Sequence, residues 1–172
     1  MSLLIRPYGP GDSLEVLTAL LRRAYAPLAE LGFRYLTARQ RPETTAARIE
    51  NATCFLGFLE GRLAASITLS PPERTRGCPW YDRPDVGCFG QFGVEPELQR
   101  QGIGSRMLAH LEAQARISGT AELALDTAES AEHLIRYYRK HGYRLVGHAD
   151  WRPITNYRSV VMSKPLAPPS EP

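Results

Sequence analysis

The stretch from Gln99 to Gly104, with the sequence Gln-Arg-Gln-Gly-Ile-Gly, constrains the fold of this chain more than any other segment. It follows an apolar run that ends at Val94, and it precedes a segment whose apolar residues recur at helical spacing. Two glycines remove side chains where the loop turns into the helix, so backbone N–H groups and the positive end of the helix dipole face one space. The pattern therefore predicts a phosphate-binding loop at residues 99–105, with a diphosphate as the expected anion.

This loop differs from two common phosphate-binding patterns. A nucleotide P-loop requires Gly-x-x-x-x-Gly-Lys followed by Ser or Thr, and the stretch contains no lysine. The dinucleotide pattern Gly-x-Gly-x-x-Gly also fails, because Met107 stands where the third glycine would be. What remains is Gln/Arg-x-x-Gly-x-Gly/Ala, beginning at Gln99.

Hydrophobic spacing and turn residues divide the rest of the chain into strands and helices. Strands are predicted at residues 3–5, 53–59, 62–69, 87–94, 122–126, 143–147 and 158–163. Helices are predicted from a cap at Asp12 or Ser13 to a kink or end at Pro27, from Pro42 to about Glu50, over 103–118 and over about 130–141. This order indicates a mixed α/β sheet in one domain, residues 1–164, with a disordered tail at 165–172.

Composition narrows the classes of partner. The formal net charge of +3 in 172 residues is small and is spread along the chain, so nucleic acid is not an expected partner. The three cysteines have no Cys-x-x-Cys spacing and do not suggest a disulfide framework. Because neither a signal peptide nor an apolar run of about 20 residues is visible, we expect a cytoplasmic protein without a membrane segment.

A second motif lies downstream of the glycine loop. It reads Leu125-Asp126-Thr127-Ala128, followed by Ala131-x-x-Leu134-x-x-x-Tyr138-x-x-x-Gly142-Tyr143. The two motifs, in this order, resemble the GNAT superfamily of N-acetyltransferases, and the resemblance covers roughly residues 3–164. It implies a single-domain GNAT-like α/β fold, whose mixed, mostly antiparallel central sheet is flanked by helices.

The resemblance also implies a function: direct transfer of an acetyl group from acetyl-CoA, the acyl donor substrate, to an amine, without a metal. The acetyl and pantetheine region would contact Phe92, Gly93 and Val94, on a strand that carries a bulge in the family. A backbone N–H freed by that bulge would polarise the thioester carbonyl, and Gly93 would ease the distortion. The pyrophosphate would contact Gln99, Arg100, Gln101, Gly102, Ile103, Gly104 and Ser105.

Tyr138 has two interpretations. Ala131, Leu134, Ile135 and Tyr138 recur at helical spacing, which is where a core aromatic residue would lie. In the family that the chain resembles, a tyrosine four residues before the glycine often protonates the leaving thiolate. The resemblance therefore assigns Tyr138 as the catalytic general acid, with Tyr137 as the weaker candidate because it points elsewhere on the helix.

The general base is not apparent. Some family members place a glutamate early in the strand before the loop, but this chain has Cys88 at about that position, and Glu95 comes only after Val94, close to the phosphate loop. Asp82, Asp85 and Asp126 are the alternatives, together with a base acting through water. A covalent mechanism through Cys88 lacks a paired histidine in the local sequence, and the four histidines look like surface or helix residues.

The acceptor is not readable from a motif, and the resemblance allows a small-molecule amine or a peptide amine. The proline-rich loop at 70–86 is either a lid over the acceptor or a solvated connector with an aromatic anchor. A homodimer is a further expectation, because dimers are common in the family. The missing strand carboxylate keeps one alternative function open, a non-catalytic acyl-CoA-binding or sensing module.

Overall fold

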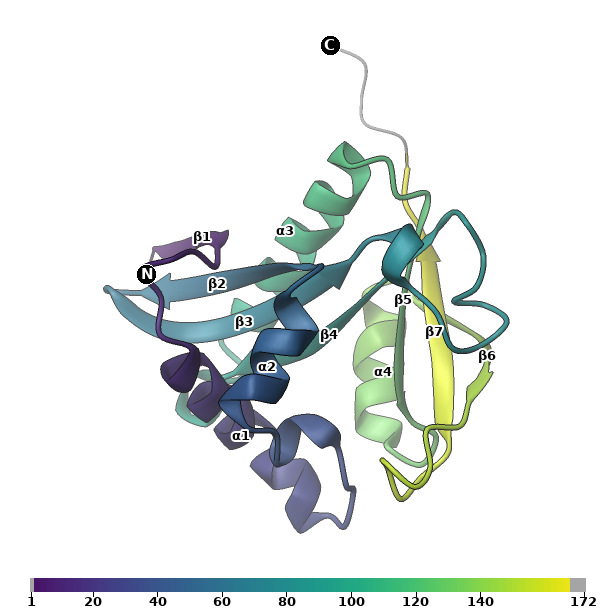
Figure 1. Cartoon of the computed structure of the whole chain (residues 1–172), viewed down its shortest axis with the longest axis horizontal. Helices are drawn as coiled ribbons and strands as arrows, with labels where there is room; N and C mark the ends of the chain where they lie inside the picture. Colours follow the sequence, from purple (N-terminus) through teal and green to yellow (C-terminus); the bar gives the residue numbers. More distant parts are fainter. Residues whose placement is uncertain (1, 168–172) are drawn as a thin grey trace.

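Seven strands form one sheet, in the order β1-β2-β3-β4-β5-β7-β6, in the computed structural model, which describes residues 2–167 (Figure 1). The strands are β1 (Leu3–Pro7), β2 (Thr53–Leu59), β3 (Arg62–Ser70), β4 (Val86–Val94), β5 (Glu122–Ala128), β6 (Arg144–Ala149) and β7 (Ser159–Pro165). Every neighbouring pair is antiparallel except β4 and β5, which are parallel. The predicted α/β fold with a mixed, mostly antiparallel sheet is confirmed.

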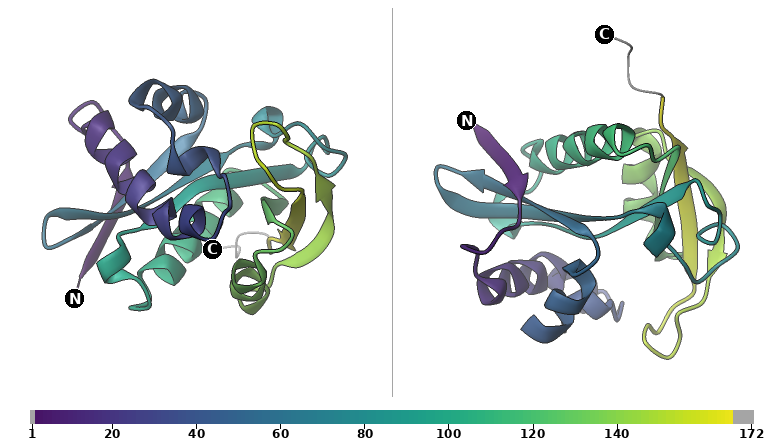
Figure 2. Two further views of the ribbon diagram at one scale, coloured as in Figure 1. Left: turned by 90° about the horizontal axis from the view of Figure 1, so that it is seen from below. Right: turned by 45° about the horizontal axis from the view of Figure 1, so that its top comes forward.

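Helices cover both faces of this sheet. They are α1 (Leu14–Glu30), α2 (Pro42–Ile49), α3 (Ile103–Ile117) and α4 (Glu132–Lys140), with short 3-10 turns at η1 (Leu36–Ala38), η2 (Pro72–Arg74) and η3 (Pro96–Leu98). Figure 2 shows α1 and α2 on one face of the sheet, with α3 and α4 on the other. Among residues 2–167, no helix has both the length and the apolar character needed to cross a membrane.

Two glycines let helices approach the sheet closely, one on each face. A Cβ on Gly57 in β2 would lie 2.7 Å from the sulfur of Met107 on α3. A Cβ on Gly93 in β4 would lie 2.8 Å from the Cβ of Ala24 on α1. Such distances leave no room for a side chain, so both helices pack directly against strand backbone at these points. Gly93 therefore has a packing role in addition to the backbone role that the sequence suggested.

The parallel pair β4 and β5 is joined over a short length only. Val86, Gly87 and Cys88 pair with Glu122, Leu123 and Ala124, and no further pairs follow between the two strands. Beyond this point the strands diverge, as Figure 1 shows, with β4 continuing to Val94 and β5 to Ala128. The two strands are therefore separated in the part of the sheet that leads to the glycine loop.

Some element boundaries differ from the sequence expectations. Pro27 does not end α1, which continues to Glu30 and regains a hydrogen bond from Leu31 N–H to the Pro27 carbonyl (3.2 Å). Ser13, not Asp12, caps this helix by accepting from Val16 N–H. At the other end of the chain, Pro165 closes β7 and Leu166 is buried, its N–H donating to the Ala121 carbonyl. Residues 168–172 of the expected tail lie outside the described residues.

Candidate active site

The glycine loop ends at the N-terminus of α3, where the backbone is open. Gly102 is the N-cap residue with φ of +80°, and no side chain caps this helix end. A Cβ on Gly102 would meet no heavy atom within 4 Å, so glycine is favoured here by its backbone conformation rather than by lack of space. At Gly104 space is limiting, because a Cβ there would lie 3.2 Å from the Tyr137 hydroxyl. The N-terminus of α3 is therefore uncapped and open at Gly102, whereas Gly104 lets Tyr137 approach the first turn closely.

Neighbouring polar side chains fold back onto the loop. Gln99 Nε2 donates to the Val94 carbonyl (3.2 Å), and Gln101 Nε2 donates to the Glu97 carbonyl (3.3 Å). The Ser105 hydroxyl pairs with His141 Nε2 (2.9 Å), whose other ring nitrogen contacts the Tyr137 carbonyl (2.9 Å). His141 thus links the end of α4 to the start of α3, a contact that the local sequence does not reveal.

A bulge interrupts β4 immediately before the loop. Ser66 pairs with Gly93 whereas Thr68 pairs with Gly90, so β4 has one extra residue there. Gln91, at the bulge, has φ of +46°, a conformation that costs roughly 1–2 kcal/mol for a non-glycine residue. Its buried side chain accepts a hydrogen bond from Gln40 Nε2 (2.8 Å), and its carbonyl accepts one from the Ser66 hydroxyl (3.2 Å). These bonds hold the irregular backbone in place.

A cavity of about 850 Å³ lies where β4 and β5 separate. Its wall includes most of the residues expected to contact the donor, namely Phe92, Gly93, Val94, Gln99, Arg100, Gly102, Gly104 and Ser105. Two others are not in the wall: Gln101 is exposed, and the Ile103 side chain is buried in the core between α3 and the sheet. One cavity therefore joins the glycine loop to the bulged strand.

Both tyrosines of α4 line this cavity. Tyr138 is buried, its ring packs edge-on against Phe89 and Tyr143, and burial, helped by neighbouring tyrosines, raises its pKa well above the usual value. Tyr138 therefore packs in the core and also lines the cavity, and its role as general acid stays a prediction. Tyr137, expected on another face, also lines the cavity, and its buried hydroxyl has no hydrogen-bond partner among residues 2–167. Burial raises its pKa as well.

Among the described residues, Asp126 on β5 is the only one that brings a carboxyl group to the cavity wall. Tyr81 Oη donates to its Oδ1 (2.8 Å) and Trp151 Nε1 to its Oδ2 (2.9 Å). Burial raises the Asp126 pKa, and these two hydrogen bonds oppose that shift without cancelling it. A carboxyl group with a raised pKa, open to a cavity, is a candidate for proton transfer.

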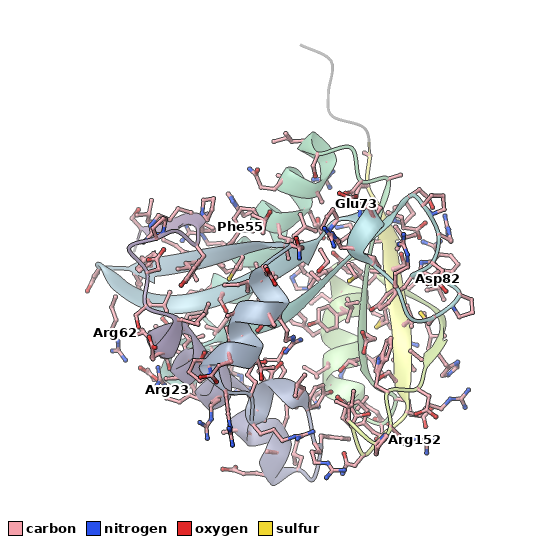
Figure 3. The ribbon with its side chains drawn as sticks, in the orientation of Figure 1. Arg23, Phe55, Arg62, Glu73, Asp82 and Arg152 are labelled. Carbon is pink, nitrogen blue, oxygen red and sulfur yellow. The ribbon has the colours of Figure 1, made fainter. Side chains whose placement is uncertain are left out.

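Of the other groups considered as bases, His133 of α4 is also in the cavity wall, and the carboxyl groups lie elsewhere. Asp82 accepts from Gly77 N–H on the loop that Figure 3 shows beside β7, and Asp85 pairs with Arg83. Glu95 is buried in an ion pair with Arg23 of α1. Burial raises the pKa of Cys88 to about 11, so its thiol is protonated at neutral pH, which argues against a nucleophilic role.

The end of the cavity remote from the glycine loop is mainly aromatic. Its wall includes Tyr25 of α1, Tyr35 before η1, and Trp151 and Tyr157 of the β6–β7 connection. Arg48 of α2 also lines it, although no motif in the sequence points to this residue. None of the loop residues 71–85 is in the wall. The loop instead supports the site from behind, through Tyr81, so of its two interpretations the structure favours the connector with an aromatic anchor.

Residues 2–167 contain no group of three or more His, Cys, Asp or Glu side chains positioned to hold a metal ion. The groups that the described residues present to the cavity are instead a helix N-terminus, a bulged strand, five tyrosines, the Asp126 carboxyl, the His133 imidazole and the guanidinium groups of Arg48 and Arg100. Together they are suited to binding an anion and to moving protons.

Comparison with known proteins identifies sequence relatives over most of the chain. Residues 15–143 match the family model described as the acetyltransferase (GNAT) family. S-(2-succino)cysteine N-acetyltransferase from Bacillus subtilis (strain 168) is 31% identical over 139 residues, which span 79% of this chain and 81% of that protein.

Solved structures show the same fold. The ribosomal-protein-S18-alanine N-acetyltransferase from Escherichia coli aligns with a TM-score of 0.74 at 20% identity, covering 99% of this chain and 97% of that chain. A GNAT family acetyltransferase from Elizabethkingia anophelis with acetyl-CoA bound aligns with a TM-score of 0.68 at 16% identity, covering 95% and 98%.

Proposed function

Because the chain belongs to the GNAT family of acetyltransferases, we propose that it transfers an acetyl group from acetyl-CoA directly to the amine of a small molecule. One observation carries this proposal: a single cavity contains the glycine loop, the bulged strand, Tyr138 and Asp126. An aromatic-walled cavity suits a small acceptor better than an extended peptide.

The residues around the glycine loop fit acetyl-CoA. The uncapped N-terminus of α3 and the open space at Gly102 suit a pyrophosphate, and the separated strands suit the pantetheine arm beside Phe92–Val94. The unpartnered Tyr137 hydroxyl is a further polar group available to this ligand. When bound, acetyl-CoA supplies the acetyl group as an activated thioester.

In the proposed mechanism, the chain's own groups move two protons and hold one oxygen. The Asp126 carboxylate takes a proton from the amine, and its raised pKa makes it a better base near neutral pH than an ordinary aspartate. Backbone N–H groups at the β4 bulge hold the carbonyl oxygen as its negative charge grows. Tyr138, protonated at neutral pH, donates to the sulfur as the carbon–sulfur bond breaks and the carbon–nitrogen bond forms.

The direct test is release of free thiol from acetyl-CoA in the presence of a panel of acceptors. The panel comprises small amines, amino acids, polyamines, aminoglycosides and short peptides, with S-(2-succino)cysteine added because of the Bacillus subtilis relative. We expect thiol release with one class of small amine. Release with peptides alone would contradict the small-molecule acceptor, and no release with any acceptor, while acetyl-CoA still binds, would favour the acyl-CoA-binding module.

A further inference from the structure

Two opposite charges face the acceptor half of the cavity without forming an ion pair. The Arg48 guanidinium and the Asp126 carboxyl both line it, yet neither belongs to any ion pair within 4.0 Å among residues 2–167. The two groups still interact electrostatically. Burial lowers the pKa of Arg48 and raises that of Asp126, and each charge partly opposes the shift of the other group. The cavity therefore holds a separated positive and negative charge.

The hydrogen bonds of Arg48 orient it and leave one edge free. Its Nη1 donates to the Thr37 hydroxyl (2.9 Å) and to Gln40 Oε1 (2.7 Å), and both acceptors are neutral. Its Nη2 and Nε donate to no group in the described part of the chain. Gly90 lies beside Nη2, since a Cβ there would be 3.6 Å from that nitrogen, so no side chain from this position covers it. The Nε–Nη2 edge can bind a carboxylate through two parallel hydrogen bonds, and it is the edge that does not use the engaged Nη1.

A short relay of hydrogen bonds fixes this guanidinium relative to the bulge. Arg48 bonds to Gln40, and Gln40 in turn bonds to Gln91, the residue with positive φ in β4. Gln40 and Gln91 are each 2% exposed, so the relay lies in the interior. An anion held by Arg48 would therefore occupy a defined position with respect to the backbone that we assign to the carbonyl oxygen.

A partly desolvated guanidinium without an anion is unfavourable, and a ligand that brings a carboxylate removes that cost. The same holds for Asp126 and a ligand that brings an ammonium group. A molecule with an amine and a carboxylate a few bonds apart satisfies both at once. A simple alkylamine satisfies only one, and a peptide N-terminus carries its own carboxylate far from the amine.

We propose that the acceptor is an amino carboxylate resembling an α-amino acid, with its carboxylate on the Nε–Nη2 edge of Arg48 and its amine toward Asp126. This inference rests on the proposed function and narrows it to one class of acceptor. The rest of the molecule would contact the aromatic wall formed by Tyr25, Tyr35 and Tyr157.

The experiment compares matched acceptors on the full chain. The common amino acids and S-carboxymethylcysteine are tested for thiol release, and each active compound is then compared with its amide and its decarboxylated amine. We expect kcat/KM for the free acid to exceed that of both derivatives by roughly tenfold or more, as for a hydrogen-bonded charge pair. Equal or faster reaction of the amides would overturn the inference, as would activity confined to polyamines or peptides.

Variants of Arg48 separate recognition from folding. Arg48→Gln should raise KM for the free acid by roughly tenfold to hundredfold and leave the amide nearly unaffected, while Arg48→Lys should lie between. Arg41→Gln, at an exposed arginine that precedes the same helix, is the matched control and should change neither value. A purely structural role of Arg48 would lower activity toward acid and amide by the same factor, which would overturn the inference.

A binding measurement keeps the two proposals distinguishable. If no acceptor releases thiol, the proposed function fails. Calorimetric titration of the same acids and amides into the CoA-bound protein then tests whether Arg48 binds a carboxylate. Binding of the acids alone, lost in Arg48→Gln, would support the carboxylate site. Equal binding of acids and amides, or binding of neither, would overturn it.

Discussion

Removal of the Tyr138 hydroxyl should slow the acetyl transfer step without weakening the binding of acetyl-CoA. Tyr138→Phe keeps the ring that packs on Phe89 and Tyr143, so the fold should be unaffected. We expect kcat to fall roughly 10²–10⁴-fold, the usual contribution of a general acid, with the Kd for acetyl-CoA nearly unchanged. Steady-state kinetics and calorimetry check this.

Tyr137→Phe is the matched variant, since it removes a hydroxyl from the same cavity at the neighbouring position. Its effect should fall on the KM for acetyl-CoA rather than on kcat. Wild-type kcat in Tyr138→Phe, or a larger loss of kcat in Tyr137→Phe, would show that Tyr138 is not the acid.

The Asp126 carboxyl should set the acidic side of the pH profile. Burial raises its pKa, and only the ionised form accepts a proton, so kcat/KM should rise as the pH increases through that raised value. Asp126→Asn should lower kcat/KM by roughly 10²-fold or more and abolish this rise. Profiles of both proteins from pH 5 to 9 check this, and an unchanged acidic limb in the variant would assign the limb to another group.

At the residue scale, the sequence identified candidate site residues that belong to a local motif. The tyrosine before Gly142 and the glycines of the loop were identifiable because their spacing is itself the signal. Arg48, Tyr35 and His141 were not, because each reaches the cavity or the loop through packing between elements distant in sequence. Among the candidate bases, only the fold shows that Asp126 faces the cavity while Asp82 and Asp85 do not.

At the scale of elements, the two ends of α3 offer a controlled test of the glycine loop. Gly102 before the helix and Gly119 after it have φ of +80° and +81°, and a Cβ at either would meet nothing within 4 Å. Alanine at either position should therefore lower the free energy of unfolding by a similar amount, about 1 kcal/mol. Only Gly102→Ala should also weaken CoA binding, by roughly tenfold or more, because its Cβ and any backbone shift lie at the proposed phosphate site.

Calorimetric titration with CoA and thermal melts of both variants give the two quantities. Equal CoA affinity of Gly102→Ala, Gly119→Ala and the wild-type protein would contradict the assignment of the pyrophosphate to residues 99–105.

Elements with strong local signals were predicted well and those set by tertiary packing less well. The β2–β3 hairpin and α3 agree with the expected ranges to within a residue or two at each end. The sequence left open whether Pro27 kinks or ends α1, and the helix continues to Glu30 because one lost backbone hydrogen bond is tolerated when the next turn packs, as Leu28 does against the cluster that contains Tyr35. The bulge was expected from the resemblance at 92–94, whereas the register shift begins at Gln91, whose supporting contacts come from distant residues.

At the scale of the whole molecule, ligand binding should raise thermal stability clearly. The sheet is continuous only through the short β4–β5 pairing, and a ligand lodged between the separated strands would add contacts to both halves. At 100 times its Kd, CoA should add about 2.7 kcal/mol, which for a domain of this size corresponds to a rise in Tm of roughly 5–10 °C.

Thermal melts with and without CoA test this rise, and Gly102→Ala at the same CoA concentration should show a smaller one. An unchanged Tm of the wild-type protein at saturating CoA would contradict the assigned donor site.

The fold class was predictable from the sequence because the order of strands and helices and two motifs all indicated one architecture. The shape of the acceptor end was not predictable, since its wall combines α1, α2, the turn before η1 and the β6–β7 connection. No single segment contains enough of it to produce a pattern.

That division of the cavity wall has an evolutionary consequence. The groups assigned to the donor lie in residues 92–105 and on α4, whereas the acceptor wall comes from residues 25–48 and 151–157. Apart from Gln40, which supports the β4 bulge through Gln91, residues of the second set can change without altering the first, so a gene duplicate keeps its acetyl donor while its acceptor preference changes. A lineage descended from this chain would therefore diversify by substitution of Arg48 and its aromatic neighbours. Its members would share the residues assigned to the acetyl donor but would acetylate different acceptors.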